Sequence, residues 1–125
     1  MLSYSVDGRI LTVVATGTTP GADRRQFYAG IEADARVPLG ALLLVDARRA
    51  DPVEDVHELE ERAHLIASLL GPKMGPVCAI IAPPRLLTDA NFFQAASGQL
   101  GIRVGIFNDE PDARRWLQTF AGQSI

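Results

Sequence analysis

The sequence predicts an α/β domain built on a five-stranded, mostly parallel sheet with an N-terminal hairpin and four helices. Two observations lead to this fold class. Residues 41–45 are five consecutive apolar residues between Gly40 and Asp46, which is typical of a strand buried on both faces. After the hairpin, helical and strand-like segments alternate to the end of the chain. This order favours parallel strands joined by right-handed crossovers.

The predicted hairpin is marked by Asp7-Gly8, which separates two strand-like segments, residues 4–6 and 9–16. An Asp-Gly pair favours a tight turn, because both central residues of the preferred two-residue turn need positive φ. The second segment is rich in β-branched residues and apolar on both faces. We therefore expect it to be a central strand that ends at Gly17.

The first helix is predicted to follow this strand. A hydroxyl of Thr18 or Thr19 would form its N-cap, and Pro20 would take its first position. Pro38 and Gly40 end the segment and lead into the buried strand. Its apolar side is predicted to consist of residues spaced four apart, which are Phe27, Ile31 and Ala35.

The second helix shows the clearest helical periodicity. It is predicted to begin at Asp51-Pro52 and to end at Gly71. The charged residues along it, Arg62 among them, are assigned to the side that faces solvent. Apolar residues step by three and four along the segment and form one buried stripe, which consists of Val56, Leu59, Ala63, Ile66 and Leu70.

The rest of the chain continues the alternation. Residues 77–82 predict a fourth strand, a third helix begins near Thr88, and residues 102–107 predict a fifth strand. Asn108-Asp109 then caps a last helix. The apolar face of this helix is predicted to consist of Ala113, Trp116, Leu117 and Phe120.

Length and composition indicate one domain that spans residues 1–125. A net charge of −3 gives no electrostatic reason to expect nucleic acid or an anionic membrane as a partner. No stretch reaches the roughly 20 apolar residues of a membrane span, and the first residues lack the pattern of a signal peptide. We therefore expect no integral membrane segment and a cytoplasmic location. The strong excess of Arg over Lys indicates the coding bias of a GC-rich bacterial genome.

The common catalytic and metal motifs are missing from the sequence. There is no G-x-S-x-G, no P-loop, and no G-x-G-x-x-G after a predicted strand. His57, Glu61 and His64 share a helical face at zinc-ligand spacing, but we expect that face to point into solvent and predict no metal site and no cofactor. Cys78 is the lone cysteine and lies in an apolar run, which indicates a buried, unreactive thiol.

The strand ends are the best candidate for a ligand site, because open α/β sheets bind ligands outside the carboxyl ends of their strands. Asp46 and Arg48 follow the third predicted strand, Arg85 follows the fourth, and Asn108 follows the fifth. We expect these four residues to converge at one edge of the sheet. In the alternative interpretation, Asp46 pairs with a neighbouring arginine and only fixes the turn.

Several of these elements together resemble the SpoIIAA-like family of small bacterial proteins, which is related to the STAS domains of anti-sigma-factor antagonists and sulfate transporters. The resemblance implies a SpoIIAA/STAS-like superhelix of strand–helix units, a binding or regulatory role, and no known cofactor. It is carried by the hairpin at 4–8, Gly17 with the threonine after it, the strand 42–48 closing in D-x-R, and the segment 106–117.

The chain departs from the antagonists of this family at one functional position. The antagonists carry a phosphorylatable Ser or Thr at the start of the second helix. Residues 47–67 contain no Ser, Thr or Tyr here, and the first hydroxyl after them is Ser68. We therefore do not expect the phosphorylation switch. The superhelical topology also resembles lipid-binding SEC14-like domains.

Three functions follow from these observations. The first is a non-enzymatic binding or regulatory interaction module of unknown partner, the alternative is a carrier of a small apolar or lipid-like ligand, and the third is an unrecognised enzyme. A pocket between the helices would favour the carrier, and a flat apolar surface patch would favour the interaction module. We also expect a homodimer, formed through the edge strand at residues 2–6 or through the terminal helix and the apolar tail 120–125.

Overall fold

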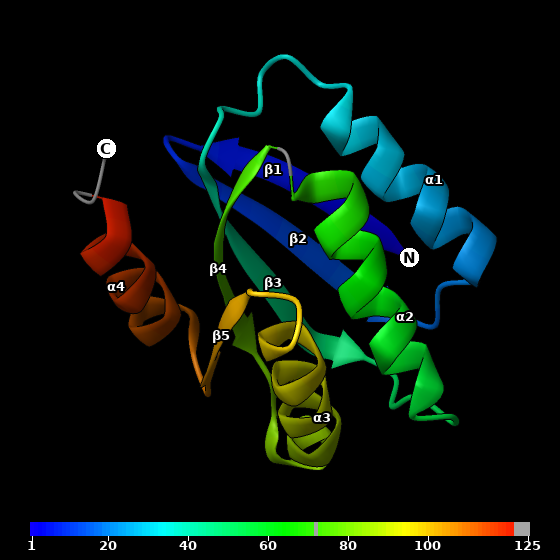
Figure 1. Cartoon of the computed structure of the whole chain (residues 1–125). Coiled ribbons are helices and arrows are strands. Elements are labelled where there is room, and N and C mark those ends of the chain that lie inside the picture. Colours follow the sequence, from blue (N-terminus) through cyan, green and yellow to red (C-terminus); the bar gives the residue numbers. More distant parts are fainter. Residues whose placement is uncertain (72, 122–125) are drawn as a thin grey trace.

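The computed structural model describes residues 1–71 and 73–121, and for residues 69 and 70 it describes the backbone only. Within this part of the chain, five strands form one sheet in chain order, β1-β2-β3-β4-β5 (Figure 1). The β1–β2 pair is antiparallel and the other three pairs are parallel. The strands are β1 (Leu2–Asp7), β2 (Ile10–Gly17), β3 (Ala41–Ala50), β4 (Met74–Ile81) and β5 (Arg103–Phe107).

Four α-helices are described, which are α1 (Gly21–Glu32), α2 (His57–Leu65), α3 (Leu87–Gly98) and α4 (Glu110–Ala121). A π-helical segment, η1 (Ile66–Leu70), continues α2, and a 3-10 turn, η2 (Pro84–Leu86), precedes α3. The predicted α/β class, with its hairpin, mostly parallel sheet and four helices, is thus confirmed. None of the described helices combines the length and the apolar character that crossing a membrane would require.

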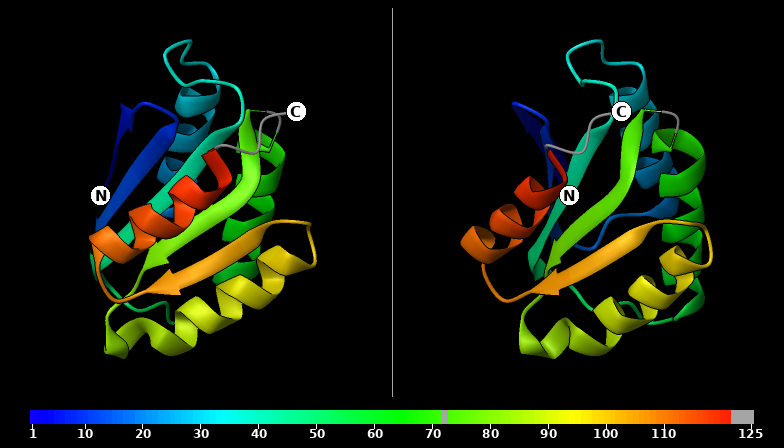
Figure 2. Two further views of the ribbon diagram at one scale, coloured as in Figure 1. Left: turned by 90° about the vertical axis from the view of Figure 1, so that its left-hand side faces the viewer. Right: turned by 60° about the vertical axis from the view of Figure 1, so that its left-hand side comes forward.

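Three helices cover one face of the sheet and the fourth covers the other (Figure 2). α1, α2 and α3 pack on one side, whereas α4 lies over β3, β4 and β5. β3 is the middle strand, and the side chains of its apolar run point alternately into the cores on the two faces of the sheet. Leu43 belongs to the core under the three helices and Leu44 to the core under α4, and both are 0% exposed. The prediction of a central third strand is therefore confirmed.

The turn of the hairpin lies one residue later than the sequence predicts. Asp7 pairs with Ile10, so Gly8 and Arg9 are the two central residues. Of these two, only Gly8 has a positive φ, of 60°. A glycine at the first central position is the pattern of a type II′ turn, which needs one residue with positive φ where the predicted turn needs two.

β3 continues to Ala50, well past the predicted run. Asp46 and Arg48 therefore lie within the strand, and the prediction that they follow it is wrong. The strand continues because its residues alternate: Ala47 is buried against the three-helix face, and Arg48 reaches Glu110 of α4 on the other. Alternating buried and exposed side chains are typical of a strand that has one face against a core.

α1 turns the predicted Ile31 into the core and Phe27 packs against that core, but Arg24 and Tyr28 are buried on this side as well. The helix begins at Gly21 without a side-chain cap, and Thr18 Oγ1 donates a hydrogen bond to Asp51 Oδ2 at 2.7 Å. The predicted threonine cap is therefore wrong. Ala35 lies beyond the helix and is exposed, so its place on the apolar side is also wrong. The buried residues of α1 are Arg24, Tyr28 and Ile31.

α2 begins later than predicted, at His57, whose backbone N–H donates to Asp55 Oδ1 at 3.0 Å. Val56 precedes the helix and is 47% exposed, so its assignment to the buried stripe is wrong. The side chain of Leu70 lies outside the described residues. The members of the predicted stripe that are buried are Leu59, Ala63 and Ile66.

α4 is the helix that the sequence predicts best. Asp109 Oδ1 accepts a hydrogen bond from the backbone N–H of Asp112 at 2.9 Å, as an N-cap does. The aromatic rings of Trp116 and Phe120 pack with Phe107 at the margin of the core. Residues 122–125 of the predicted apolar tail lie outside the described residues. The fully buried members of the predicted face are Ala113 and Leu117.

Candidate functional site

The strand-end residues predicted as a ligand site are engaged with their neighbours. Arg48 binds Asp46 at two points, with Nε 2.9 Å from Oδ1 and Nη2 2.7 Å from Oδ2. These hydrogen bonds hold the pKa of Asp46 below its usual value and raise the pKa of Arg48. Arg48 Nη2 also lies 3.5 Å from Glu110 Oε1. The pair therefore links the end of β3 to α4.

Arg85 holds the same strand end from the other side. Its Nη1 donates to the carbonyl oxygen of Ala50 at 2.8 Å, and its Nη2 donates to that of Arg48 at 3.0 Å. Asn108 is exposed in the turn before α4, and its side chain makes no hydrogen bond with a residue that the structure describes. The structure thus brings Asp46, Arg48 and Arg85 together around the end of β3. None of the four predicted residues lines the cavity and clefts described next.

A cavity of about 80 Å³ lies between the sheet and the three helices α1, α2 and α3. β2, β3 and β4 form its floor, toward their carboxyl ends, and the helices form its walls. This is the place where α/β sheets of this kind accommodate ligands. Its lining is mostly aliphatic and aromatic and includes Val13, Val45, Leu59, Ile66, Ile80 and Phe93.

Two arginines stand at the rim of this cavity, Arg24 from α1 and Arg62 from α2. Arg24 is only 9% exposed, lies beside the hydroxyl of Tyr28, and makes no ion pair with any residue that the structure describes. The Arg62 side chain is 24% exposed, and Glu58 Oε2 lies 3.8 Å from its Nη2. Burial lowers the pKa of Arg62, and the positive charge of Arg24 lowers it further. Two cations thus line the same cavity, together with the carboxylates of Asp51 and Asp89.

The carboxylates of this region bind other donors. Asp89 Oδ2 accepts a hydrogen bond from the backbone N–H of Val53 at 3.0 Å, and Asp51 Oδ2 accepts one from Thr18 at 2.7 Å. Both bonds hold the loop between β3 and α2 in place. No carboxylate oxygen of a described residue lies within 4.0 Å of the Arg24 guanidinium.

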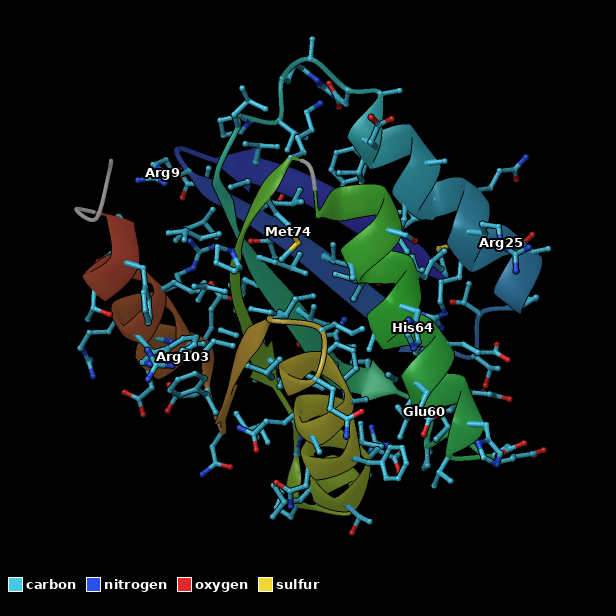
Figure 3. All side chains as sticks on the ribbon, viewed as in Figure 1. Arg9, Arg25, Glu60, His64, Met74 and Arg103 are labelled. Atoms are coloured by element: carbon cyan, nitrogen blue, oxygen red, sulfur yellow. The ribbon has the colours of Figure 1, made fainter. Side chains whose placement is uncertain are left out.

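Two clefts on the surface meet at the same two arginines. One, of about 400 Å³, runs along Thr18, Thr19 and the loop after β3. The other, of about 580 Å³, lies between α1 and α2 and is bordered by Arg25 and His64, which Figure 3 labels. Arg24 and Arg62 line both clefts and the cavity. They therefore stand where the interior of the protein opens to solvent.

Sequence reasoning missed this part of the molecule. Arg62 was assigned to the solvent-facing side of its helix, which is wrong, and Arg24 and Tyr28 were not singled out. The available signal was the spacing of Arg24, Tyr28 and Ile31, which step by four and three along one helical face. Tyr28 is buried, which raises the pKa of its hydroxyl, and the charge of Arg24 beside it opposes that rise.

Other chemically distinctive side chains lie apart from the cavity. Cys78 is fully buried, as predicted, and burial raises the pKa of its thiol to about 12. His57, Glu61 and His64 are exposed along α2. Among the described residues, no three His, Cys, Asp or Glu side chains are grouped as metal ligands.

Comparisons of the chain with protein-family models, with curated proteins and with solved structures each found no significant match. The function is therefore argued from the site alone.

Proposed function

We propose that this protein is a non-enzymatic binding module that carries a small molecule, with an apolar part of that molecule held in the cavity under α1, α2 and α3. The observation that carries this proposal is the cavity itself. It is bounded by the sheet and three helices, lined mostly by apolar side chains, and shares Arg24 and Arg62 with two surface clefts. An apolar group that enters it is removed from water, which is favourable.

The surface of the molecule favours a small ligand over a docked protein. Among the residues that the structure describes, the large apolar side chains that are exposed come from four separate segments: Met1, Leu39, Val56 and Leu87. A protein-docking face is expected to gather such residues into one contiguous patch. The cavity is a more specific feature than these scattered exposed side chains, and we therefore place the carrier ahead of the interaction module.

The SpoIIAA-like assignment belongs to the same proposal. It is supported by the antiparallel hairpin that opens the sheet and by the strand order that follows the chain. A non-catalytic role is supported by the engagement of Asp46 and Arg85, whose polar groups hold the end of β3. Those side chains fix the frame around the cavity and are not directed into it.

The proposal is tested with neutral apolar probes, a series of straight-chain alcohols from propanol upward, by titration calorimetry. The affinity should rise about fourfold for each added methylene, since each buried methylene contributes about 0.8 kcal/mol. The rise should stop once the cavity is full.

The matched variants lie on one helix, α3. Ala90 is 1% exposed and lines the cavity, so Ala90→Leu should fill it and abolish alcohol binding. Ala95 is exposed on the same helix, and Ala95→Leu should bind as the natural protein does. Equal binding by both variants, or no binding of any alcohol by the natural protein, would refute the carrier.

A further inference from the structure

Arg24 is an unusual residue to find at the wall of a cavity. It is 9% exposed, and its polar neighbour is the hydroxyl of Tyr28, yet no carboxylate of a described residue lies within 4.0 Å of its guanidinium. A charge that is mostly removed from water and has no counter-ion beside it costs free energy. In folded proteins such charges are normally paired, so the missing partner at this position is the feature to be explained.

Arg62 adds a second positive charge to the lining of the same cavity. Like charges in a desolvated site repel each other, and the lowered pKa of Arg62 reports burial together with the charge of Arg24. The carboxylate of Glu58 lies 3.8 Å from Arg62 at the outer side and leaves Arg24 unpaired. An anion between the two guanidiniums would relieve the desolvation of one and the repulsion of both.

We propose that Arg24 and Arg62 bind the carboxylate of an amphipathic acid whose short apolar chain occupies the cavity. This inference rests on the proposed function and names the class of ligand. The planar guanidinium forms two parallel hydrogen bonds with a carboxylate, and such charge-assisted bonds are stronger than neutral ones. A cavity of about 80 Å³ suits a chain of a few carbon atoms, and the adjoining clefts open beside the arginines.

The test compares an acid with the alcohol of equal length, butanoate and 1-butanol, by titration calorimetry near pH 7. Hydrogen bonds to a charged group predict that the natural protein binds butanoate at least about tenfold more tightly than 1-butanol. Arg24→Gln should abolish this preference. Arg62→Gln should reduce the preference less, because Arg62 is more exposed than Arg24 and already has a carboxylate nearby.

Arg115→Gln is the matched control, since it removes an exposed guanidinium from α4 on the opposite face of the sheet. This variant should keep the full preference for butanoate. Amide chemical shifts of the natural protein give a readout that does not depend on any variant folding. Butanoate should shift signals around residues 24 and 62, and shifts confined to β5 or α4 would overturn the inference.

Two further probes separate the anion site from the cavity. Acetate, which has almost no chain, should bind weakly and in an Arg24-dependent manner, and this result would stand even if no alcohol binds. Equal affinities for butanoate and 1-butanol would refute the anion site and leave the apolar cavity as a binding site. Displacement of butanoate by inorganic phosphate but not by acetate would overturn the carboxylate in favour of a phosphoryl group.

Discussion

Tyr4 on β1 donates its hydroxyl hydrogen bond to the carboxylate of Asp34, 30 residues further along the chain. The same carboxylate accepts hydrogen bonds from Arg36, with its Nε 3.0 Å from Oδ1 and its Nη2 2.7 Å from Oδ2. Lys73, which precedes β4, donates to the backbone carbonyls of Glu32 and Asp34. One short turn after α1 thus joins the edge strand, the first helix and the start of the fourth strand.

This arrangement makes the stability of the protein depend on pH through Asp34. Hydrogen bonds from Arg36 and from Tyr4 hold the pKa of its carboxyl well below its usual value. A carboxyl with a depressed pKa in the folded state stabilises the protein above its unfolded pKa of about 3.9, and this contribution is lost as the pH falls toward the folded pKa.

Asp34→Asn should therefore lower the free energy of unfolding at neutral pH and flatten its decline below about pH 4. Urea titrations at a series of pH values measure this. Asp23→Asn is the control, because Asp23 is exposed and its side chain makes no hydrogen bond with a described residue. An Asp34→Asn profile parallel to that of the natural protein would show that the interactions of Asp34 do not stabilise the fold.

The centre of the sheet should be the least tolerant part of the molecule. Leu43 is 0% exposed in the middle strand, so Leu43→Ala should cost about 2–5 kcal/mol of unfolding free energy. Leu39→Ala removes the same atoms from a side chain that is 79% exposed and should change stability by less than about 0.5 kcal/mol. A loss below about 1 kcal/mol for Leu43→Ala would contradict its position in the core.

Whereas truncating Leu43 should destabilise the fold, replacing Arg24 with an apolar residue should stabilise it. Arg24→Met replaces a mostly buried charge that has no counter-ion with an apolar side chain of similar length, and we expect the free energy of unfolding to rise by about 1 kcal/mol or more. Thermal unfolding without any ligand measures this rise. Arg25→Met changes an exposed neighbour and should have little effect. A destabilised Arg24→Met variant would indicate that Arg24 supports the fold and would weaken the case for a ligand.

The contrast between Leu43 and Arg24 shows what the sequence could predict. The apolar run at residues 41–45 indicated a strand buried on both faces, since little else explains five such residues in a row, and Leu43 is fully buried. An arginine is most often exposed, so the spacing of Arg24 with Tyr28 and Ile31 was a weak reason to place it inside. Its burial depends on the tertiary packing around α1, which contacts η1, and periodicity along one segment does not contain that packing.

The residues at the end of β3 show a second limit of prediction from the sequence. Asp46 and Arg48 were expected to leave the sheet because they are charged. Ala47 between them is buried, and this alternation was present in the sequence. Their mutual ion pair then depends on β3 staying extended, because residues two apart in a strand point to the same face. The alternative interpretation, in which Asp46 pairs with a neighbouring arginine, matches the observed pair with Arg48. The hydrogen bonds of Arg85 to two carbonyls of β3 could not be predicted from the end of an apolar run.

We predict that the protein carries no phosphorylation switch of the antagonist kind. Residues 47–67, which include the start of α2, contain no hydroxyl side chain. Incubation with a panel of bacterial serine kinases and ATP, followed by intact-mass measurement, should show no stoichiometric addition of phosphate. Ser68 is exposed in η1 and is the first hydroxyl after that segment. Stoichiometric modification of Ser68 would contradict the prediction.

β1 is one edge of the described sheet, and its backbone sets the direction of any further pairing. In an antiparallel pair, alternate residues exchange both backbone hydrogen bonds with the partner strand. Met1 and Thr16 form such a pair. The backbone groups of Leu2, Tyr4 and Val6 therefore point away from β2, where a strand of a second copy would find them.

We predict a homodimer in which this edge, or the outer surface of α4, meets its own copy about a twofold axis. The acidic segment at residues 54–61 is a poor twofold contact, because its charges would approach the same charges of the partner.

Light scattering at micromolar concentration should give twice the monomer mass. Val6→Pro removes one outward N–H and should yield a monomer if β1 is the interface, whereas Val6→Ala, which keeps that N–H, should remain dimeric. Dimers that persist in Val6→Pro would place the interface on α4, and loss of the dimer on changing Glu61 and Arg62 would place it on α2. A monomer mass at every concentration would refute the dimer.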